Sequence, residues 1–442
     1  MFFLLFVEFS TFISEILRYI KRLSCRPNGF IHSHQADSGR KMLDLQKTRG
    51  FMAGLRPSAT LAISGRAKEM RASGLDVCSM SAGEPDFDTP QAIKEACIAA
   101  LNAGKVGYTA ASGMPELKKL IAEKFTVEDG IATTPDRIVV APGAKFSIFS
   151  AIGALCGPGD EVVIPAPFWL SYPEIVRASG AVPVALPTSA DAAYEPDAAA
   201  LEAIITDRTR LIILNSPSNP TGAVYRRETL EAIAEVAVRR NVMVLADEIY
   251  GRLTYNPALP HCSIASLNRE IADRTITVNG FSKTYAMTGW RLGYLTAPAW
   301  LTRRIAALQS HATSNPTTFA QYGAIAALEG KAEEEVRAMI RAFGERRELI
   351  CKLLEKIPQL TFHKPDGAFY VMCDISAFGL NSDDFCARLL EKALVAAIPG
   401  RSFNAEGMIR LSYACSEDNI RKSVERIGNF CAGLGSRQES AK

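Results

Sequence analysis

Short apolar runs alternate with helix-like stretches over most of the chain, and this alternation constrains the fold more than any other feature. Continuous runs of β-branched and aliphatic residues favour a parallel sheet that is buried on both faces. The stretches between them, such as residues 227–240, carry apolar side chains at helical spacing. Strands that alternate with helices predict an α/β layer fold. The predicted strands are residues 137–141, 161–165, 210–214, 242–246 and 275–278.

The pattern changes after about residue 315. A charged helical pattern over residues 331–356 is followed by strand-like runs at 368–373 and 408–413. A chain of 442 residues exceeds what one core normally fills. We therefore expect a large domain over residues 86–315, built on a mostly parallel sheet flanked by helices. A smaller α+β domain should cover residues 316–436, with residues 42–85 contributing to it.

The first 41 residues differ from the rest and are expected to form a disordered extension. Residues 1–17 are apolar, but Glu8 and Glu15 interrupt them and no basic residue precedes them, so they match neither a secretory signal nor a membrane span. The basic, polar stretch that follows keeps an organelle transit peptide as the alternative. A cytoplasmic location is preferred, because the ten cysteines form no Cys-x-x-Cys pair and no metal-type cluster with histidine. The net charge of +3 is scattered, which gives no sign of a nucleic-acid or membrane partner.

The most specific chemical signal is the segment GFSKTYAMTGWRLG at residues 280–293. A predicted strand runs into a turn that presents Ser282 and Lys283, and Arg291 follows eight residues after the lysine. An aldehyde cofactor with a phosphate tail needs an amine for a covalent bond, and a cation and hydroxyl donors about one cofactor length away. These three side chains supply such groups. The alternative, a solvated Lys–Arg surface pair, fits poorly with the apolar, glycine-rich surroundings.

A second signal is the segment VLADEIY at residues 244–250, an apolar strand that ends in Asp247. The carboxyl ends of parallel strands are where open α/β sheets bind ligands. An anionic Asp247 would keep a pyridine nitrogen protonated, which makes the ring an electron sink. Tyr250 can donate to the phenolic oxygen of such a ring. Taken alone, an aspartate at a strand end is about as often structural.

Two turns complete the pattern, although each is weak alone. In NSPSNPTG at residues 215–222, Asn219 precedes Pro220 and can hydrogen-bond the same phenolic oxygen. In APGAK at residues 141–145, free amides at a helix start suit a phosphate, and Gly143 permits close approach.

Together these four segments resemble the class I aminotransferases, which are pyridoxal 5′-phosphate enzymes of fold type I, and the match runs from about residue 50 onward. The resemblance implies that Lys283 forms the Schiff base with the cofactor and carries the proton. It implies that Asp247 pairs with the pyridinium, and that Tyr250 and Asn219 contact the phenolic oxygen. The implied phosphate contacts are Ser282, Arg291 and the backbone amides of Gly143, Ala144 and Lys145.

The resemblance implies further contacts outside these segments. Trp169 matches the aromatic that stacks on the cofactor ring, and both it and Asn219 are expected to border the substrate. Arg410 matches the arginine that holds the substrate α-carboxylate in a bidentate fork, and Gly83 the glycine whose amide touches that carboxylate. Tyr108 matches a tyrosine that reaches the phosphate of the neighbouring subunit, which implies a homodimer with shared active sites.

A finer similarity is to the subgroup 1b aspartate aminotransferases and the aspartate/prephenate aminotransferases. These read the distal carboxylate of the substrate with a lysine at the position of Lys145, and a threonine at the position of Thr60 is associated with prephenate. A lysine at a helix start is not favoured by the helix dipole, which points to a ligand. The implied substrates are aspartate or glutamate with 2-oxo acids such as 2-oxoglutarate, and prephenate as a further acceptor.

Two alternatives stay open. One is another activity on the same fold, namely an aromatic or alanine aminotransferase or a carbon–sulfur lyase. The remote one is a transcription regulator that senses pyridoxal phosphate. Such a regulator needs a basic winged-helix domain, and the roughly 50 residues that precede the fold are too few for it.

Overall fold

The computed structural model describes residues 54–439. The expectations for residues 1–41, and for the start of the 42–85 segment, lie outside the described residues. The described residues form a single compact unit. The finer division at residues 86 and 316 therefore stays a prediction.

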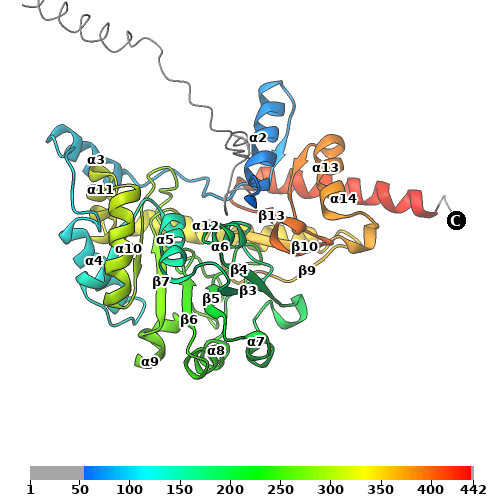
Figure 1. Cartoon of the computed structure of the whole chain (residues 1–442). Helices are drawn as coiled ribbons and strands as arrows, with labels where there is room; N and C mark the ends of the chain where they lie inside the picture. The colour runs from blue at the N-terminus through cyan, green and yellow to red at the C-terminus, as the bar shows by residue number, and fades with distance from the viewer. Residues whose placement is uncertain (1–53, 440–442) are drawn as a thin grey trace, which may run out of the picture. The chain divides into compact units, whose positions relative to one another are not determined.

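A seven-stranded sheet carries the site, and its strands are ordered β2-β8-β7-β6-β5-β3-β4 (Figure 1). Only β8 runs antiparallel to its neighbours, so the sheet is mostly parallel, as predicted. In sequence order the strands are β2 (Ile138–Ala141), β3 (Glu161–Ala166), β4 (Val182–Pro187), β5 (Thr209–Asn215), β6 (Met243–Asp247), β7 (Thr275–Gly280) and β8 (Gly293–Thr296).

Both faces of this sheet are buried, which explains the continuous apolar runs. In β5, Leu211 and Ile213 face one core, while Ile212 and Leu214 face another. Helices α5 (Ala144–Leu155), α6 (Ser171–Ala178) and α10 (Ala299–Ala312) cover the first face. Helices α7 (Ala198–Ile204), α8 (Arg227–Arg239) and α9 (Arg269–Ala272) cover the second (Figure 1).

All five strands expected in the first part of the chain are present, with ends that differ by one or two residues. The sequence reading missed β4 and β8. Strand β8 begins at Gly293, at the end of the 280–293 motif. The chain therefore turns back beside β7 within the motif itself, with Gly280 opposite Gly293.

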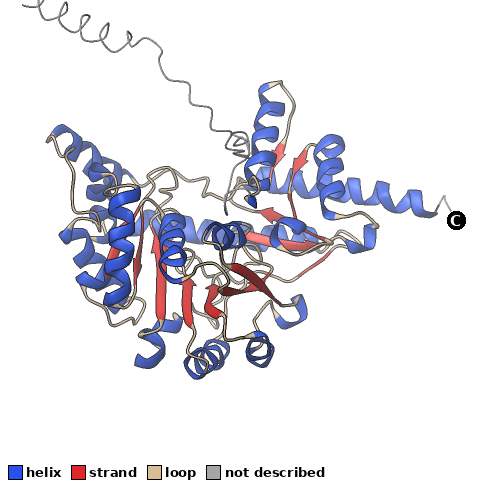
Figure 2. Cartoon of the chain, viewed as in Figure 1, coloured by secondary structure: helices blue, strands red, loops and turns tan. Residues whose placement is uncertain are grey.

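A second sheet lies outside the large one (Figure 2). It is antiparallel, in the order β12-β13-β10-β9, and a short parallel pair joins β1 to β11. The pair sets Cys78 against Val395, so residues before 80 pack with the C-terminal part. The elements are α2 (Ala59–Ala72), β1 (Cys78–Ser79), β9 (Thr361–Phe362), β10 (Tyr370–Asp374), α13 (Ser382–Ala393), β11 (Val395–Ala396), β12 (Ile398–Pro399), β13 (Met408–Ser412) and α14 (Glu417–Glu439).

Four more helices complete the unit. Helix α12 (Glu333–Leu354) buries Phe343 and Ile350 in the core of the antiparallel sheet. Helices α3 (Gln91–Asn102), α4 (Pro115–Val127) and α11 (Thr318–Leu328) form a separate cluster against the β2 end of the large sheet. Within residues 54–439, no helix combines the length and apolarity that a membrane span requires.

Candidate active site

A cavity of about 850 Å³ lies at the carboxyl ends of the parallel strands, where the turns after β2, β5, β6 and β7 meet. It brings together twelve of the fourteen residues singled out from the sequence. These are Thr60, Gly83, Ala144, Lys145, Trp169, Asn219, Asp247, Tyr250, Ser282, Lys283, Arg291 and Arg410. Gly143 does not line the cavity, but it directly precedes Ala144, which does. Tyr108 does not line the cavity, and 91% of its surface is exposed.

Asp247 is a buried carboxylate at the end of β6, in register with Asn215 at the end of β5. Its Oδ2 accepts a 2.6 Å hydrogen bond from the Tyr172 hydroxyl, and its Oδ1 accepts one from the Ile249 amide at 3.2 Å. Burial raises the pKa of Asp247 to about 6, and these two bonds oppose the rise. No lysine or arginine within residues 54–439 forms an ion pair with it. Asp247 is therefore fixed in position by its hydrogen bonds, and its charge is available to a cationic group of a ligand.

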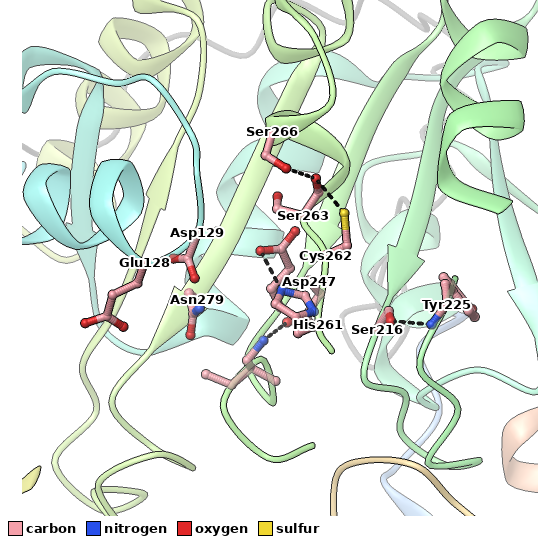
Figure 3. A network of polar contacts seen from close by, with 12 residues as sticks. Glu128, Asp129, Ser216, Tyr225, Asp247, His261, Cys262, Ser263, Ser266 and Asn279 are labelled. Atoms are coloured by element: carbon pink, nitrogen blue, oxygen red, sulfur yellow. Dashed lines mark hydrogen bonds and ion pairs between the residues drawn. The ribbon is translucent and has the colours of Figure 1, made fainter. Parts of the chain in front are cut away.

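The next residue, Glu248, is also buried, and its Oε2 lies 3.2 Å from His261 Nε2. Figure 3 shows His261 beside the segment that carries Asp247. Burial lowers the pKa of His261, but the charges of Glu248 and Asp129 outweigh this effect and raise the pKa overall. A protonated His261 compensates the second carboxylate, so it reduces the repulsion that Glu248 exerts on Asp247.

Lys283 follows β7, and its amine donates to the Gly83 carbonyl. No carboxylate of the described chain pairs with it. Burial lowers the pKa of Lys283 to about 8, and the charges of Arg410 and Arg291 act in the same direction. An amine with such a pKa has a sizeable neutral fraction near pH 7, which is the form that attacks a carbonyl carbon.

Arg410, on β13, is 2% exposed. Its Nη1 donates to Asn219 Oδ1 at 2.9 Å, and its Nη2 to the Ser81 carbonyl at 3.0 Å, but its Nε has no partner. The guanidinium lies over the Tyr370 ring, 4.3 Å from the centroid. A buried cation that pairs with no carboxylate of the described residues is costly unless a ligand supplies the anion. This arrangement therefore fits a carboxylate ligand.

The turn before α5 has the form of an anion cradle. Gly143 has φ +90°, and a Cβ there would lie 2.4 Å from Arg291 Nη2, so a side chain would collide with the guanidinium. The Gly143 amide donates to the Ala141 carbonyl at 2.7 Å, so, against the expectation, it is not free for a phosphate. The amides of Ala144 and Lys145, the first two of α5, have no partner among the described residues, as is usual at a helix start. Together with the Arg291 guanidinium, these amides suit a phosphate.

Lys145 and Thr60 also reach the cavity. Lys145 Nζ lies 4.7 Å from the centroid of the Trp169 ring and forms no ion pair with the described residues. Desolvation and then the Arg291 charge lower the pKa of Lys145. Thr60 Oγ1 is buried and has no hydrogen-bond partner among residues 54–439. Both groups are available to a polar ligand.

Four residues of the site were missed by the sequence reading. Tyr172 lies three residues after Trp169, and Asn215 opens the 215–222 segment and ends the strand beside β6. Both residues could have been predicted, because they lie close in the sequence to residues already assigned to the site. Ser81 and Tyr370 come from outside the large sheet, and no local pattern marks them.

These groups fit the cofactor that the resemblance implies. A buried amine, a buried carboxylate and an anion cradle match its aldehyde, ring nitrogen and phosphate, each supplied by a different turn. No cluster of histidine, cysteine, aspartate or glutamate in residues 54–439 has the make-up of a metal site.

Comparisons with known proteins agree with this geometry. Residues 76–427 match the family model for aminotransferase class I and II. The chain is 46% identical over 377 residues to a probable aspartate/prephenate aminotransferase of Aquifex aeolicus, covering 84% of this chain and 95% of that protein. It is 45% identical over 381 residues to an aspartate aminotransferase of Bacillus sp. (strain YM-2), covering 85% and 97%. The solved aspartate aminotransferase of Thermus thermophilus with maleate superposes with a TM-score of 0.83 at 40% identity, covering 86% of this chain and all of that one.

Proposed function

The chain belongs to the class I and II aminotransferases, and from this membership we propose that it moves the amino group of aspartate or glutamate to 2-oxo acids such as 2-oxoglutarate, with prephenate as a further acceptor. It is a transaminase of fold type I, and pyridoxal 5′-phosphate is its cofactor. The substrate proposal rests on two cations, Arg410 and Lys145, which form no ion pair with any described residue and line one cavity together with Lys283.

When bound, pyridoxal phosphate supplies an aldehyde that bonds to amines and a ring that accepts electrons from the substrate Cα. Lys283 would hold the cofactor through its amine. When it is not bonded, Lys283 Nζ would take up and hold the proton of the substrate Cα. Its lowered pKa suits this role, because a base works best when its pKa lies near the working pH.

The groups around Lys283 set the charge of the site. Asp247 would hold the ring nitrogen protonated, and Tyr172 holds Asp247 in place through its 2.6 Å hydrogen bond. Tyr250 and the free amide nitrogen of Asn219 would donate to the phenolic oxygen. Trp169 would cover the ring. Ser282, Arg291 and the amides of Ala144 and Lys145 would hold the phosphate, and Gly143 would let it approach closely.

Two cations set the choice of substrate. Arg410 would bind the α-carboxylate through the guanidinium edge that its present partners leave free, with the Gly83 amide beside it. Lys145 would bind the distal carboxylate of aspartate or glutamate. The cavity of about 850 Å³ also leaves space for a bulkier acceptor. The Thr60 hydroxyl, which has no partner among the described residues, would hydrogen-bond that acceptor.

We also propose that the active unit is a homodimer in the cytoplasm. Tyr108 is a large side chain with 91% of its surface exposed, which suits a residue that reaches into a neighbouring subunit. The nine cysteines in the described part of the chain are free thiols, as expected of a reducing compartment.

The proposal is tested by following the nitrogen atom. Purified holoenzyme is incubated with ¹⁵N-labelled aspartate and unlabelled 2-oxoglutarate, and the products are identified by mass spectrometry. The expected product is ¹⁵N-labelled glutamate in an amount equal to the aspartate consumed. Release of labelled ammonia would identify a lyase. Transfer from alanine or an aromatic amino acid, with none from aspartate, would identify a different specificity.

A further inference from the structure

Tyr370, the first residue of β10, contacts Tyr250 and Arg410 of the proposed site and lies close to Gly83. Its hydroxyl oxygen lies 2.9 Å from the hydroxyl oxygen of Tyr250. Its ring centroid lies 4.3 Å from the Arg410 guanidinium. A Cβ built on Gly83 would lie 3.5 Å from its hydroxyl. Tyr370 itself is fully buried.

Which of the two hydroxyls, Tyr250 or Tyr370, donates the hydrogen bond depends on the other partners that each one has. Burial raises the pKa of both phenols above the ordinary value for tyrosine, so each keeps its single proton at neutral pH. If Tyr250 donates its proton to the phenolic oxygen of the cofactor, its own oxygen is left as the acceptor for Tyr370. Tyr250 is the only hydrogen-bond partner of the Tyr370 hydroxyl within residues 54–439.

We propose that Tyr370 is a positioning residue that couples the two ends of the site: its hydroxyl polarises Tyr250, and its ring holds the Arg410 guanidinium. The inference rests on the proposed function, since it requires the cofactor at Tyr250 and a carboxylate at Arg410. In a chain of hydrogen bonds each bond strengthens the next, so Tyr370 makes Tyr250 a better donor. A cation over a buried aromatic face is held in position by the ring quadrupole.

The hydroxyl has a spectroscopic consequence. Donation to the phenolic oxygen draws negative charge from that oxygen, and this lowers the proton affinity of the Lys283 nitrogen conjugated to it through the ring. Without the Tyr370 hydroxyl, Tyr250 donates less strongly. The pH at which the visible absorbance of the holoenzyme changes should then rise.

The experiment compares Tyr370→Phe with wild-type holoenzyme. The visible absorbance is titrated with pH, and the dissociation constant of maleate is measured as an unreactive dicarboxylate. We expect the absorbance pKa to rise by a few tenths of a unit, and by less than in Tyr250→Phe, because Tyr370 strengthens the Tyr250 bond by about 10–30% and does not itself reach the cofactor. Maleate affinity should stay within about twofold, because the ring over Arg410 remains. Tyr370→Leu, which also lacks the ring, should bind maleate about 5- to 30-fold more weakly.

Tyr413→Phe is the matched control, because Tyr413 is equally buried and its hydroxyl donates to the Ala368 carbonyl at 3.3 Å, away from the cavity. This control should leave both quantities unchanged. If Tyr250→Phe shifts the absorbance pKa while Tyr370→Phe does not, or if Tyr413→Phe shifts it as much, the inference is wrong and the proposed function stands. A wild-type protein that shows no absorbance from bound cofactor overturns both.

Discussion

The side-chain oxygen of Asn219 accepts a 2.9 Å hydrogen bond from Arg410 Nη1, and the two residues are 191 positions apart in the sequence. Asn219 belongs to the turn after β5 of the large sheet, and Arg410 to β13 of the antiparallel sheet. One is a proposed cofactor contact, and the other the proposed holder of the substrate carboxylate. A displacement of β13 would therefore alter both functions at once.

Lys145 should select substrates that carry a second carboxylate. Lys145→Ala would leave that carboxylate unpaired in a partly desolvated cavity, which costs roughly 3–5 kcal/mol, or a few hundred- to a few thousand-fold in kcat/KM. Activity on aspartate, glutamate and prephenate should fall by this factor, while any activity on alanine, which has no second carboxylate, should be spared. Steady-state kinetics on aspartate and alanine measure the difference, with the exposed Lys352→Ala as control. Equal losses on both substrates would assign Lys145 to the cofactor or the fold.

Thr60 should matter for the bulkier acceptor. Its hydroxyl is buried and unpartnered, so Thr60→Val keeps the shape and removes one hydrogen bond to a ligand. We expect kcat/KM for prephenate to fall about 2- to 10-fold, with little change for 2-oxoglutarate. Parallel kinetics with the two oxo acids test this. A larger loss on 2-oxoglutarate would contradict the assignment.

Tyr108 should act across a subunit interface. Tyr108→Phe should weaken retention of pyridoxal phosphate by about 10- to 150-fold, the effect of one charge-assisted hydrogen bond. In a mixed dimer of Lys283→Ala and Tyr108→Phe chains, one site has both intact residues. Equal mixing should therefore restore up to about a quarter of the wild-type rate at limiting cofactor. Full activity of a monomeric protein in analytical ultracentrifugation would rule out the shared site.

The buried charge of Asp247 should lower the free energy of unfolding of the cofactor-free protein. The pKa of Asp247 is about 6 in the folded protein and near 3.8 in the unfolded chain. The free energy of unfolding is therefore highest below pH 4, where the carboxyl is protonated in both states, and it falls as the pH rises through 6. About two pKa units correspond to about 3 kcal/mol. Apo Asp247→Asn should therefore unfold at a higher temperature than apo wild type at pH 7, and the difference should vanish near pH 4. Thermal unfolding at both values measures it, with the exposed Asp273→Asn as control. A variant less stable than wild type at pH 7 would contradict the burial argument.

Much of the fold followed from local pattern, because strands buried on both faces must be continuously apolar. The lysine, aspartate and arginine of the site were found for a related reason: Asp247 ends a strand, and Lys283 and Arg291 follow one. Strand β8 was missed because it has only four residues and begins at Gly293, the last residue of a motif read as a turn. Tyr370 was missed because its place in the site depends on how β10 pairs with β13. In this pairing Met372 lies opposite Arg410, and Tyr370 is two residues away on the same strand. Contacts between residues far apart in the sequence are not indicated by the pattern of the residues next to them.

The central claim is that Lys283 carries the cofactor. Holoenzyme is reduced with borohydride, digested and sequenced by mass spectrometry, with Lys283→Ala treated in the same way. Reduction should fix the cofactor on the Lys283 amine in near-stoichiometric amount, and the variant should carry no label. A label on Lys145 or any other lysine, or cofactor that is bound but never trapped, would contradict the account.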